Sequence, residues 1–232
     1  MVPRRDNAIY RLSAALTRLA AYDFPVRLNP VTRMYFERMS TTEAGSLVAD
    51  MRSLLTDPSN TDAITRLVTV PYYNAMMRTT CVATQLEGGH ASNALPQRAR
   101  AVINCRLLPN ESPEEVIRTV RTVIADDAVA ITPDTKPETG SLSPVAPELL
   151  HVTETIAAEI WPGVPVIPLM EVGGTDGSYL RAAGIPTYGI SGLFDDIEDV
   201  RAHGKDERIA VAVFFDGLDF HYRLAKALTG RH

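Results

Sequence analysis

The sequence predicts an α/β protein in two parts, and three observations support this prediction. Residues 1–135 follow the order helix, strand, strand, helix, strand, which is a ferredoxin-like split βαβ unit without its first strand. Residues 147–228 alternate helical and strand patterns, which favours a largely parallel sheet covered by helices. The stretch at 136–146, "KPETGSLSPVA", is rich in Pro, Ser and Gly and is typical of a domain crossing. We therefore expect one domain over about 1–138 and a second over 139–232.

The first helix is predicted from about Asn7 to Tyr22. Either Asp6 or Asn7 is suited to cap its start, and its apolar residues recur at helical spacing. These residues, which form one face, are Ile9, Leu12, Leu16 and Leu19. Residues 25–73 then read as loops and short helices, so we expect an inserted helical segment there.

A β-hairpin is predicted next, from the β-rich run "MRTTCVATQLEGG" and the alternating run "ARAVINCRLLP". In the second run, one side is formed by Ala101, Ile103, Cys105 and Leu107, and the other by Arg100, Val102, Asn104 and Arg106. Cys81 and Cys105 fall on the two strands and could face each other across the hairpin. Two cysteines are too few for a disulfide framework or a cysteine-based zinc site. Two reduced, buried thiols are the preferred interpretation.

A second helix should begin after Ser112, which is suited to be its cap, with Pro113 at the first helical position and Glu115 closing a capping box. Its expected buried face is Ile117, Val120 and Ile124. The run "AVAITP" at 128–133 predicts a following strand.

The second part should contain two long helices with strands and a glycine-rich turn between them. In order, we expect a helix near 147–161, a strand at "PVIPLM", the turn "EVGGTDG", a helix through Ala182, a strand at "TYGIS", a loop with His203, and a helix from about 207 to 228.

Composition excludes two classes of partner. The chain has 232 residues and a net charge of −5, and it has no run in which Lys, Arg and aromatic residues interleave, so a nucleic acid is not an expected partner. No apolar stretch approaches the roughly 20 residues that a membrane-spanning helix needs, so a membrane is not expected either.

The turn "GGTDG" at 173–177 is one candidate site. Glycines allow backbone N–H groups to approach a ligand, and a helix N-terminus favours an anion. Thr175 and Asp176 could instead simply cap the helix that follows. On these residues alone, helix capping is preferred over ligand binding.

Asn93 in the hairpin loop and Arg106 on the returning strand form a second candidate. An arginine binds a carboxylate through two parallel hydrogen bonds, and a nearby asparagine can donate a third. A turn asparagine and a solvated surface arginine explain the same residues, and without further context that interpretation is preferred.

His203 in "RAHGKDERIA" has three interpretations: a solvated loop histidine, part of a helix-capping turn, or a metal ligand whose partners lie elsewhere. The other histidines have no ligand spacing to one another, and His90 is left out as an ordinary loop histidine.

Five segments taken in order resemble the dinuclear-zinc exopeptidase and amidohydrolase family. They are "PRRDNAIYRL", "MRTT", "EGGHASNALPQRARAVINCRLLP", "GGTDGSYLRAAGIPTYGI" and "AHGKDERI". That family includes aminoacylase, carnosinase, succinyl-diaminopimelate desuccinylase and glutamate carboxypeptidase. The segments "NPVTRMYFERM" and "MRTT" look most like its carboxypeptidase S-like branch.

The resemblance implies a role for each candidate. His203 matches a ligand of one of two zinc ions, and Asp206 or Glu207 would orient it. Asn93 and Arg106 match the residues that bind the free carboxylate of the substrate. Gly174 and Thr175 match the turn that lines the substrate pocket.

The resemblance further implies a zinc-dependent carboxypeptidase or N-acyl amino acid hydrolase, acting on a peptide or an N-acyl amino acid as a homodimer joined through a lid domain. In that family the other zinc ligands and the general-base glutamate precede the segment that matches this chain. We therefore expect this chain to be the C-terminal portion of such an enzyme, with no catalytic residue of its own, and inactive without a missing N-terminal catalytic half. The alternative is a non-catalytic dimerisation or ligand-binding module derived from the family.

Overall fold

The computed structural model describes residues 5–42, 45–133, 140–194, 201 and 204–230. The chain divides into two compact units. The first comprises Met1–Leu142 with Leu169–Gly184, and the second comprises Ser143–Pro168 with Ile185–His232. In the described part of the chain, no helix is both long enough and apolar enough to cross a bilayer.

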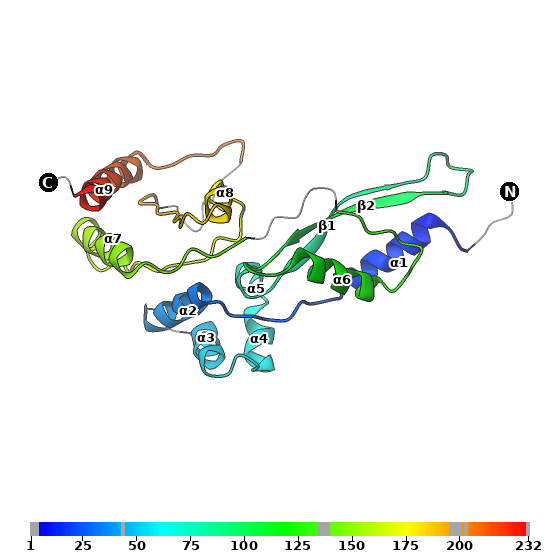
Figure 1. Ribbon diagram of the computed structural model, residues 1–232, viewed down its shortest axis with the longest axis horizontal. Coiled ribbons are helices and arrows are strands. Elements are labelled where there is room, and N and C mark those ends of the chain that lie inside the picture. The colour runs from blue at the N-terminus through cyan, green and yellow to red at the C-terminus, as the bar shows by residue number, and fades with distance from the viewer. Residues whose placement is uncertain (1–4, 43–44, 134–139, 195–200, 202–203, 231–232) are drawn as a thin grey trace. The chain divides into compact units, whose positions relative to one another are not determined.

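The first unit is built on an antiparallel hairpin of β1 (Thr80–Gly88) and β2 (Ala99–Arg106). Two helices, α1 (Ala8–Ala20) and α6 (Pro113–Ile124), lie side by side next to it (Figure 1). Their buried residues, together with Phe24, form one core: Ala15, Leu19, Val116, Val120 and Ile124. The side of β2 that was predicted to be apolar packs on this core through Ile103, Cys105 and Leu107, which confirms the predicted alternation.

Both helices begin at the predicted caps. Asn7 Oδ1 accepts a hydrogen bond from the backbone N–H of Tyr10 at 3.1 Å, and Ser112 Oγ accepts one from Glu115 at 3.3 Å. The buried face of α6 differs from the prediction at one position, because Val116 is buried and Ile117 is only partly buried. Since Val116 precedes Val120 by four residues, the two lie on the same side of the helix.

The two cysteines are joined by a disulfide in the structure, so the preference for reduced thiols was wrong. The reason is the register of the hairpin, which places Cys81 directly opposite Cys105. The sequence indicated that they could face each other, but it did not show that they are cross-strand partners.

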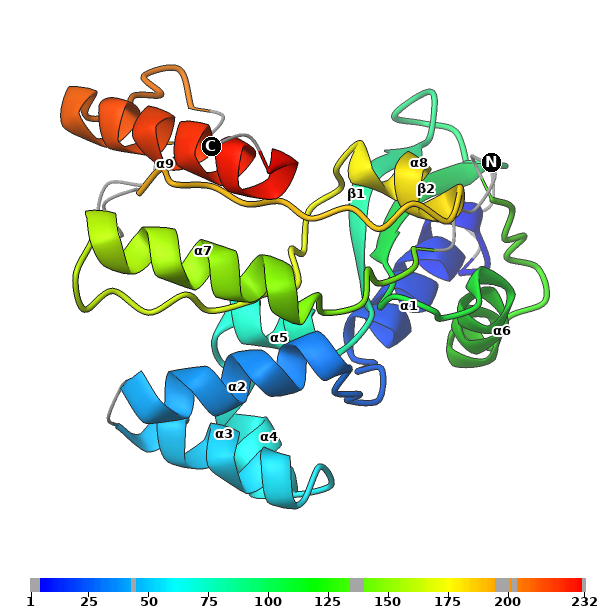
Figure 2. The same ribbon diagram turned by 60° about the vertical axis from the view of Figure 1, so that its left-hand side comes forward.

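The inserted segment folds as four helices, α2 (Pro30–Thr42), α3 (Ser46–Thr56), α4 (Thr61–Leu67) and α5 (Pro71–Met77). Figure 2 shows α2, α3 and α4 gathered together. The fully buried apolar residues of these helices are Phe36, Met51, Leu54, Ala63, Leu67, Met76 and Met77. Arg66 donates two hydrogen bonds, of 2.7 and 2.9 Å, to the buried carboxylate of Asp50. The insertion therefore has a core of its own.

The second unit consists of α7 (Pro147–Ile160) packed on α9 (Val211–Thr229). Ile156 and Ala157 of α7 are buried with Phe220 and Leu224 of α9. Trp161 extends this contact, with its ring centroid 5.5 Å from that of Phe220. Both long helices were predicted, although α9 begins at Val211 rather than near residue 207.

Three predicted strands are not strands. The segments 128–133, 165–170 and 187–191 have no ladder partner in the described part of the chain, where the sheet consists of β1 and β2. A β-rich run becomes a strand only when a neighbouring strand takes up its backbone hydrogen bonds, and sequence pattern alone does not reveal that neighbour. The run at 128–133 still packs on the α1–α6 core through Val129 and Ile131.

Candidate functional site

Arg106 is the last residue of β2 and pairs with Thr80, the first residue of β1. Its side chain is exposed, and it shares the outer side of the strand with Asn104 and Arg100, as predicted. The strand thus directs the guanidinium away from the α1–α6 core and into solvent.

This end of the hairpin is held by the "MRTT" residues. Thr79 is buried, accepts a hydrogen bond from the backbone N–H of Leu108 at 2.9 Å, and bonds to the carboxylate of Glu111. Arg78 is also buried and pairs with Asp23 at 3.0 Å. These contacts hold the chain just before β1 and just after β2, next to the Thr80–Arg106 pair.

The glycine-rich turn at 171–177 belongs to the same unit as Arg106. It leads into α8 (Gly177–Ala182), a helix capped by Asp176 without any hydrogen bond from the capping side chain. Backbone carbonyls accept instead, that of Thr175 from Ser178 at 3.0 Å and that of Asp176 from Tyr179 at 3.1 Å. Asp176 is therefore the N-cap residue, as the capping interpretation expected, but its side chain takes no part in the capping.

Gly174 lies against Arg106. A Cβ built on Gly174 would be 3.7 Å from Arg106 Nη1, which is van der Waals contact. Two of the predicted site residues are therefore brought together, from the end of a strand and from a turn far along the chain. The exposed Thr175 follows directly.

Asn93 is not brought near Arg106 within the chain. It lies in the loop that joins the strands, next to the Gly88–Ala99 pair, whereas Arg106 lies at the opposite end of the hairpin. The eight residues of β2 separate these ends by about 23 Å. The expectation that Asn93 lies near Arg106 is therefore wrong within a single chain, because the two residues lie at opposite ends of the hairpin.

Two further residues beside the turn were not singled out from the sequence. Glu171 Oε1 accepts hydrogen bonds from the N–H groups of Val172, at 2.9 Å, and Gly173, at 3.2 Å. Tyr72 of α5 is partly buried, and burial raises the pKa of its phenol. The negative charge of Glu171 raises that pKa further. The sequence "EVGGTDG" contains a signal for Glu171, but nothing in the insertion pointed to Tyr72.

His203, the predicted metal ligand, lies outside the described residues. In the turn around it, the backbone N–H of Gly204 donates to the carbonyl of Arg201 at 2.9 Å, and Arg201 also forms an ion pair with Asp206. A Cβ on Gly204 would lie 3.0 Å from that carbonyl oxygen, so a larger residue here would have to displace the carbonyl by a few tenths of an ångström. Among the described residues, no three or more His, Cys, Asp or Glu side chains are grouped so that they could hold a metal ion.

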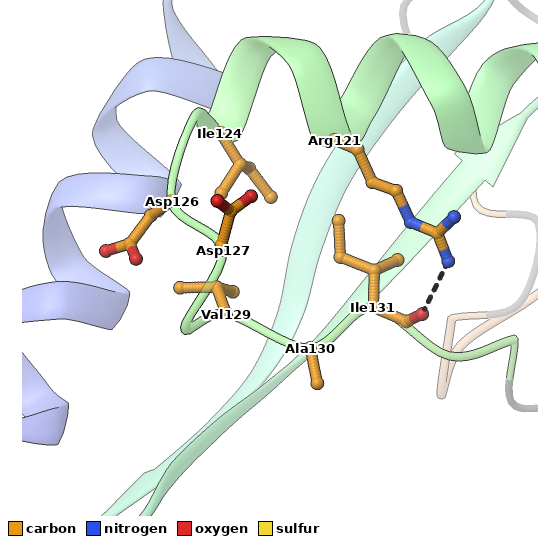
Figure 3. Close-up of a pocket in the computed structure, with 7 residues that line it drawn as sticks. All are labelled: Arg121, Ile124, Asp126, Asp127, Val129, Ala130 and Ile131. Carbon is orange, nitrogen blue, oxygen red and sulfur yellow. Dashed lines mark hydrogen bonds between the residues drawn. The ribbon is translucent and has the colours of Figure 1, made fainter.

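Two cavities of the first unit lie along α6. One has a volume of about 340 Å³ and is lined by the end of α6 and by residues 126, 127 and 129–131 (Figure 3). Beside it, Arg121 donates to the carbonyl of Ile131 at 3.3 Å, and Asp126 pairs with Arg11 at 3.1 Å. The other, of about 450 Å³, is lined by α6 and by residues that follow α1. Neither cavity is lined by a predicted site residue.

Comparison with known proteins gave matches over nearly the whole chain. Residues 2–132 match the family model of the M20 peptidase dimerisation domain. The chain is 27% identical over 231 residues to "Probable carboxypeptidase S-like 2" of Dictyostelium discoideum, covering 97% of this chain and 43% of the relative. It is 30% identical over 214 residues to an N-fatty-acyl-amino acid synthase/hydrolase of Xenopus tropicalis, covering 90% and 41%. It is 29% identical over 179 residues to rat Aminoacylase-1B, covering 71% and 40%.

A solved structure shares the fold. The crystal structure of the M20 family metallo-carboxypeptidase Sso-CP2 from Sulfolobus solfataricus matches with a TM-score of 0.60 at 16% identity, covering 95% of this chain and 52% of that one. The chain thus spans less than half the length of the curated relatives that it matches.

Proposed function

Because this chain belongs to the M20 peptidase family through its dimerisation domain, we propose that it supplies the lid and the C-terminal part of the catalytic domain of a zinc-dependent hydrolase. The substrate class is an amide next to a free carboxylate, as in a peptide with a free C-terminus or an N-acyl amino acid. The observation that carries this proposal is the position of Gly174 beside the guanidinium of Arg106.

Arg106 has the chemistry that a free carboxylate requires. A guanidinium presents two parallel N–H donors that match the two oxygens of a carboxylate, and it keeps its charge at all physiological pH values. The side chain is exposed at the end of a braced strand, and the turn opposite it carries no side chain at Gly174. A carboxylate can therefore approach the guanidinium without meeting a side chain from residue 174.

Asn93 serves the same carboxylate only if it comes from a second copy of the chain. Since about 23 Å of β2 separates it from Arg106, one chain does not place both residues on one ligand. A homodimer joined through the lid resolves this, because two-fold symmetry gives each site an arginine from one protomer and a hairpin loop from its partner. The match to a dimerisation domain supports this arrangement.

Zinc is the metal that we propose for the complete enzyme, with His203 as one ligand. The described residues bring together no ligand group that fits such a metal. A zinc site therefore needs further donors. The M20 carboxypeptidase that shares the fold is itself named a metallo-enzyme.

The domain arrangement that accompanies this function is a lid over 1–138, with the helical insertion at 25–73, and a catalytic part over 139–232. A further strand beside the β1–β2 hairpin would complete a ferredoxin-like lid sheet.

The test is hydrolysis of an N-acyl amino acid and of its C-terminal amide. The enzyme should be this chain together with the segment that carries the remaining ligands, assayed with zinc added. We expect cleavage of the acid and little cleavage of the amide. Equal cleavage of both would contradict recognition of a free carboxylate, and cleavage of neither would favour a non-catalytic module.

A further inference from the structure

The larger of the two cavities along α6 is a pocket that the proposed function does not use. Its volume of about 450 Å³ lies within the range of small-molecule binding sites. The helix contributes one continuous face to it, because the lining residues recur at spacings of three and four. These residues are Glu115, Val116, Thr119, Thr122 and Val123. The segment that follows α1 contributes Tyr22, Phe24 and Pro25.

The most buried residues that line this cavity are apolar. Phe24 and Val116 are each 7% exposed and belong to the α1–α6 core. The ring of Tyr22 packs edge-on against that of Phe24, with 5.1 Å between the centroids and 81° between the planes. An apolar side chain that enters the cavity is therefore transferred from water to a surface with two aromatic rings.

Two ion pairs line the same cavity. Arg118 Nη2 lies 3.5 Å from Glu115 Oε1, and Arg27 Nη1 lies 3.4 Å from Glu111 Oε1. Both distances exceed the roughly 3.2 Å of a good N–H···O hydrogen bond, so a ligand can reach these charges without breaking a strong interaction.

The two pairs differ in how accessible they are. The side chains of Arg118 and Glu115 are 66% and 65% exposed. The side chain of Glu111 is only 13% exposed, and its carboxylate also bonds to the hydroxyl of Thr79. The pair of Arg118 and Glu115 is therefore the one that is open to a ligand.

This pair favours a ligand that carries both charges. An anion on Arg118 would be repelled by Glu115, and a cation on Glu115 would be repelled by Arg118. An α-amino acid has its carboxylate and its ammonium group on one carbon, so it can face two side chains whose charged atoms are 3.5 Å apart. Its own side chain is then available to the apolar lining.

We propose that this cavity binds a free α-amino acid with an apolar or aromatic side chain, with the carboxylate on Arg118 and the ammonium group on Glu115. The site is separate from the proposed substrate site, because Arg106 does not line it. Hydrolysis of a peptide or an N-acyl amino acid releases a free amino acid, so the ligand belongs to the product class of the proposed function. Its recognition does not depend on that function.

The test uses three ligands that differ in their charged groups. They are L-phenylalanine, N-acetyl-L-phenylalanine, which lacks the ammonium group, and L-phenylalaninamide, which lacks the carboxylate. Each is titrated into the full chain and followed by the NMR signals of the α6 backbone amides. We expect L-phenylalanine to bind about fivefold more tightly than either analogue, because each analogue loses one exposed charged interaction. Equal binding of the three ligands, or no saturable shift with L-phenylalanine, would overturn the proposal.

Two variants assign the binding to this cavity. Arg118→Gln should weaken the binding of L-phenylalanine about fivefold, because it removes the partner of the carboxylate. Thr119→Leu should abolish the binding by filling the cavity, and it should keep the helix, because leucine is a better helix former than threonine. Binding that survives Thr119→Leu would place the ligand elsewhere and overturn the proposal.

The matched control is Arg121→Gln. Arg121 is an exposed arginine on the same helix, but it lines the other cavity. Its substitution should leave the affinity for L-phenylalanine unchanged, and a loss equal to that of Arg118→Gln would show that only the charge of the helix matters. Shifts that N-acetyl-L-phenylalanine causes around Arg106 and Gly174 bear on the proposed function alone, so the two proposals fail separately.

Discussion

Gly174 lies beside Arg106: a Cβ at residue 174 would be 3.7 Å from the guanidinium nitrogen Nη1. One methyl group fits at this distance, but a longer side chain would occupy the space that a ligand of the arginine needs. The turn and the end of β2 are therefore adjacent, and substitutions at Gly174 can test whether a ligand binds there.

Substitutions at Gly174 should show whether a side chain at this position blocks a ligand of Arg106. Gly174→Ala should bind an N-acyl amino acid about as tightly as the wild-type chain, because the added Cβ meets only ordinary contact. Gly174→Leu should weaken binding about tenfold or more by covering the guanidinium, a loss comparable to one charge-assisted hydrogen bond. Calorimetric titration of both variants measures this, and equal affinities would place the carboxylate elsewhere.

Mixing two defective variants should restore sites if a site uses residues of two protomers. Asn93→Ala and Arg106→Ala should each bind a carboxylate ligand weakly. After subunit exchange about half of the dimers are mixed, and each has one intact site, so about one quarter of the wild-type number of tight sites should return. The number of sites per chain, from calorimetry, is the measurement. No recovery on mixing would show that Asn93 does not act across a dimer.

The Cys81–Cys105 disulfide should stabilise the first unit. It joins residues separated by 24 positions, and closing a loop of this size stabilises a protein by about 3 kcal/mol through the unfolded state. We expect the Cys81→Ala/Cys105→Ala double variant to unfold at a lower denaturant concentration, followed by circular dichroism. Alkylation of the unreduced, denatured wild-type protein should modify neither cysteine, and two modified thiols would contradict the disulfide.

The Asp50–Arg66 pair should make the stability of the insertion depend on pH. The hydrogen bonds from Arg66 lower the pKa of the Asp50 carboxyl below its ordinary value. Its stabilising contribution is therefore complete above the unfolded pKa of about 4 and is lost as the pH falls from there through the folded pKa. Asp50→Asn should lower the melting temperature by several degrees at pH 7 and by less at pH 3.

The control for this prediction is Asp62→Asn, which removes an exposed carboxylate from the first turn of α4. It should change the melting temperature little at either pH. A constant difference between Asp50→Asn and the wild-type protein from pH 7 to pH 3 would show that the ion pair does not carry the effect.

Local signals predicted the helices and the hairpin well. The caps at Asn7 and Ser112 and the alternation along β2 each depend on a few neighbouring residues, and the structure confirms them. The runs at 165–170 and 187–191 have the same β-rich composition but do not form strands, because pairing depends on a neighbour that local sequence does not specify.

The candidate site, too, was predicted only in part from the sequence. Arg106 and Gly174 were singled out by resemblance, and the structure brings them together. The distance of Asn93 from Arg106 follows from the length of one strand, and the position of Tyr72 follows from how the insertion packs. Neither is encoded in a short motif.

Recognition of a free carboxylate by Arg106 is the central claim, and binding of one matched ligand pair tests it most directly. The pair is an N-acyl amino acid and its C-terminal amide, titrated against the wild-type chain, Arg106→Lys and the control Arg100→Lys from the same side of β2. Arg106→Lys keeps the charge but loses the two-pronged geometry, so it should weaken binding of the acid by about 1.5–3 kcal/mol. The same variant should leave binding of the amide unchanged, and Arg100→Lys should affect neither ligand. An equal loss for acid and amide, or no loss for either, would contradict the claim and leave Arg106 with a structural role.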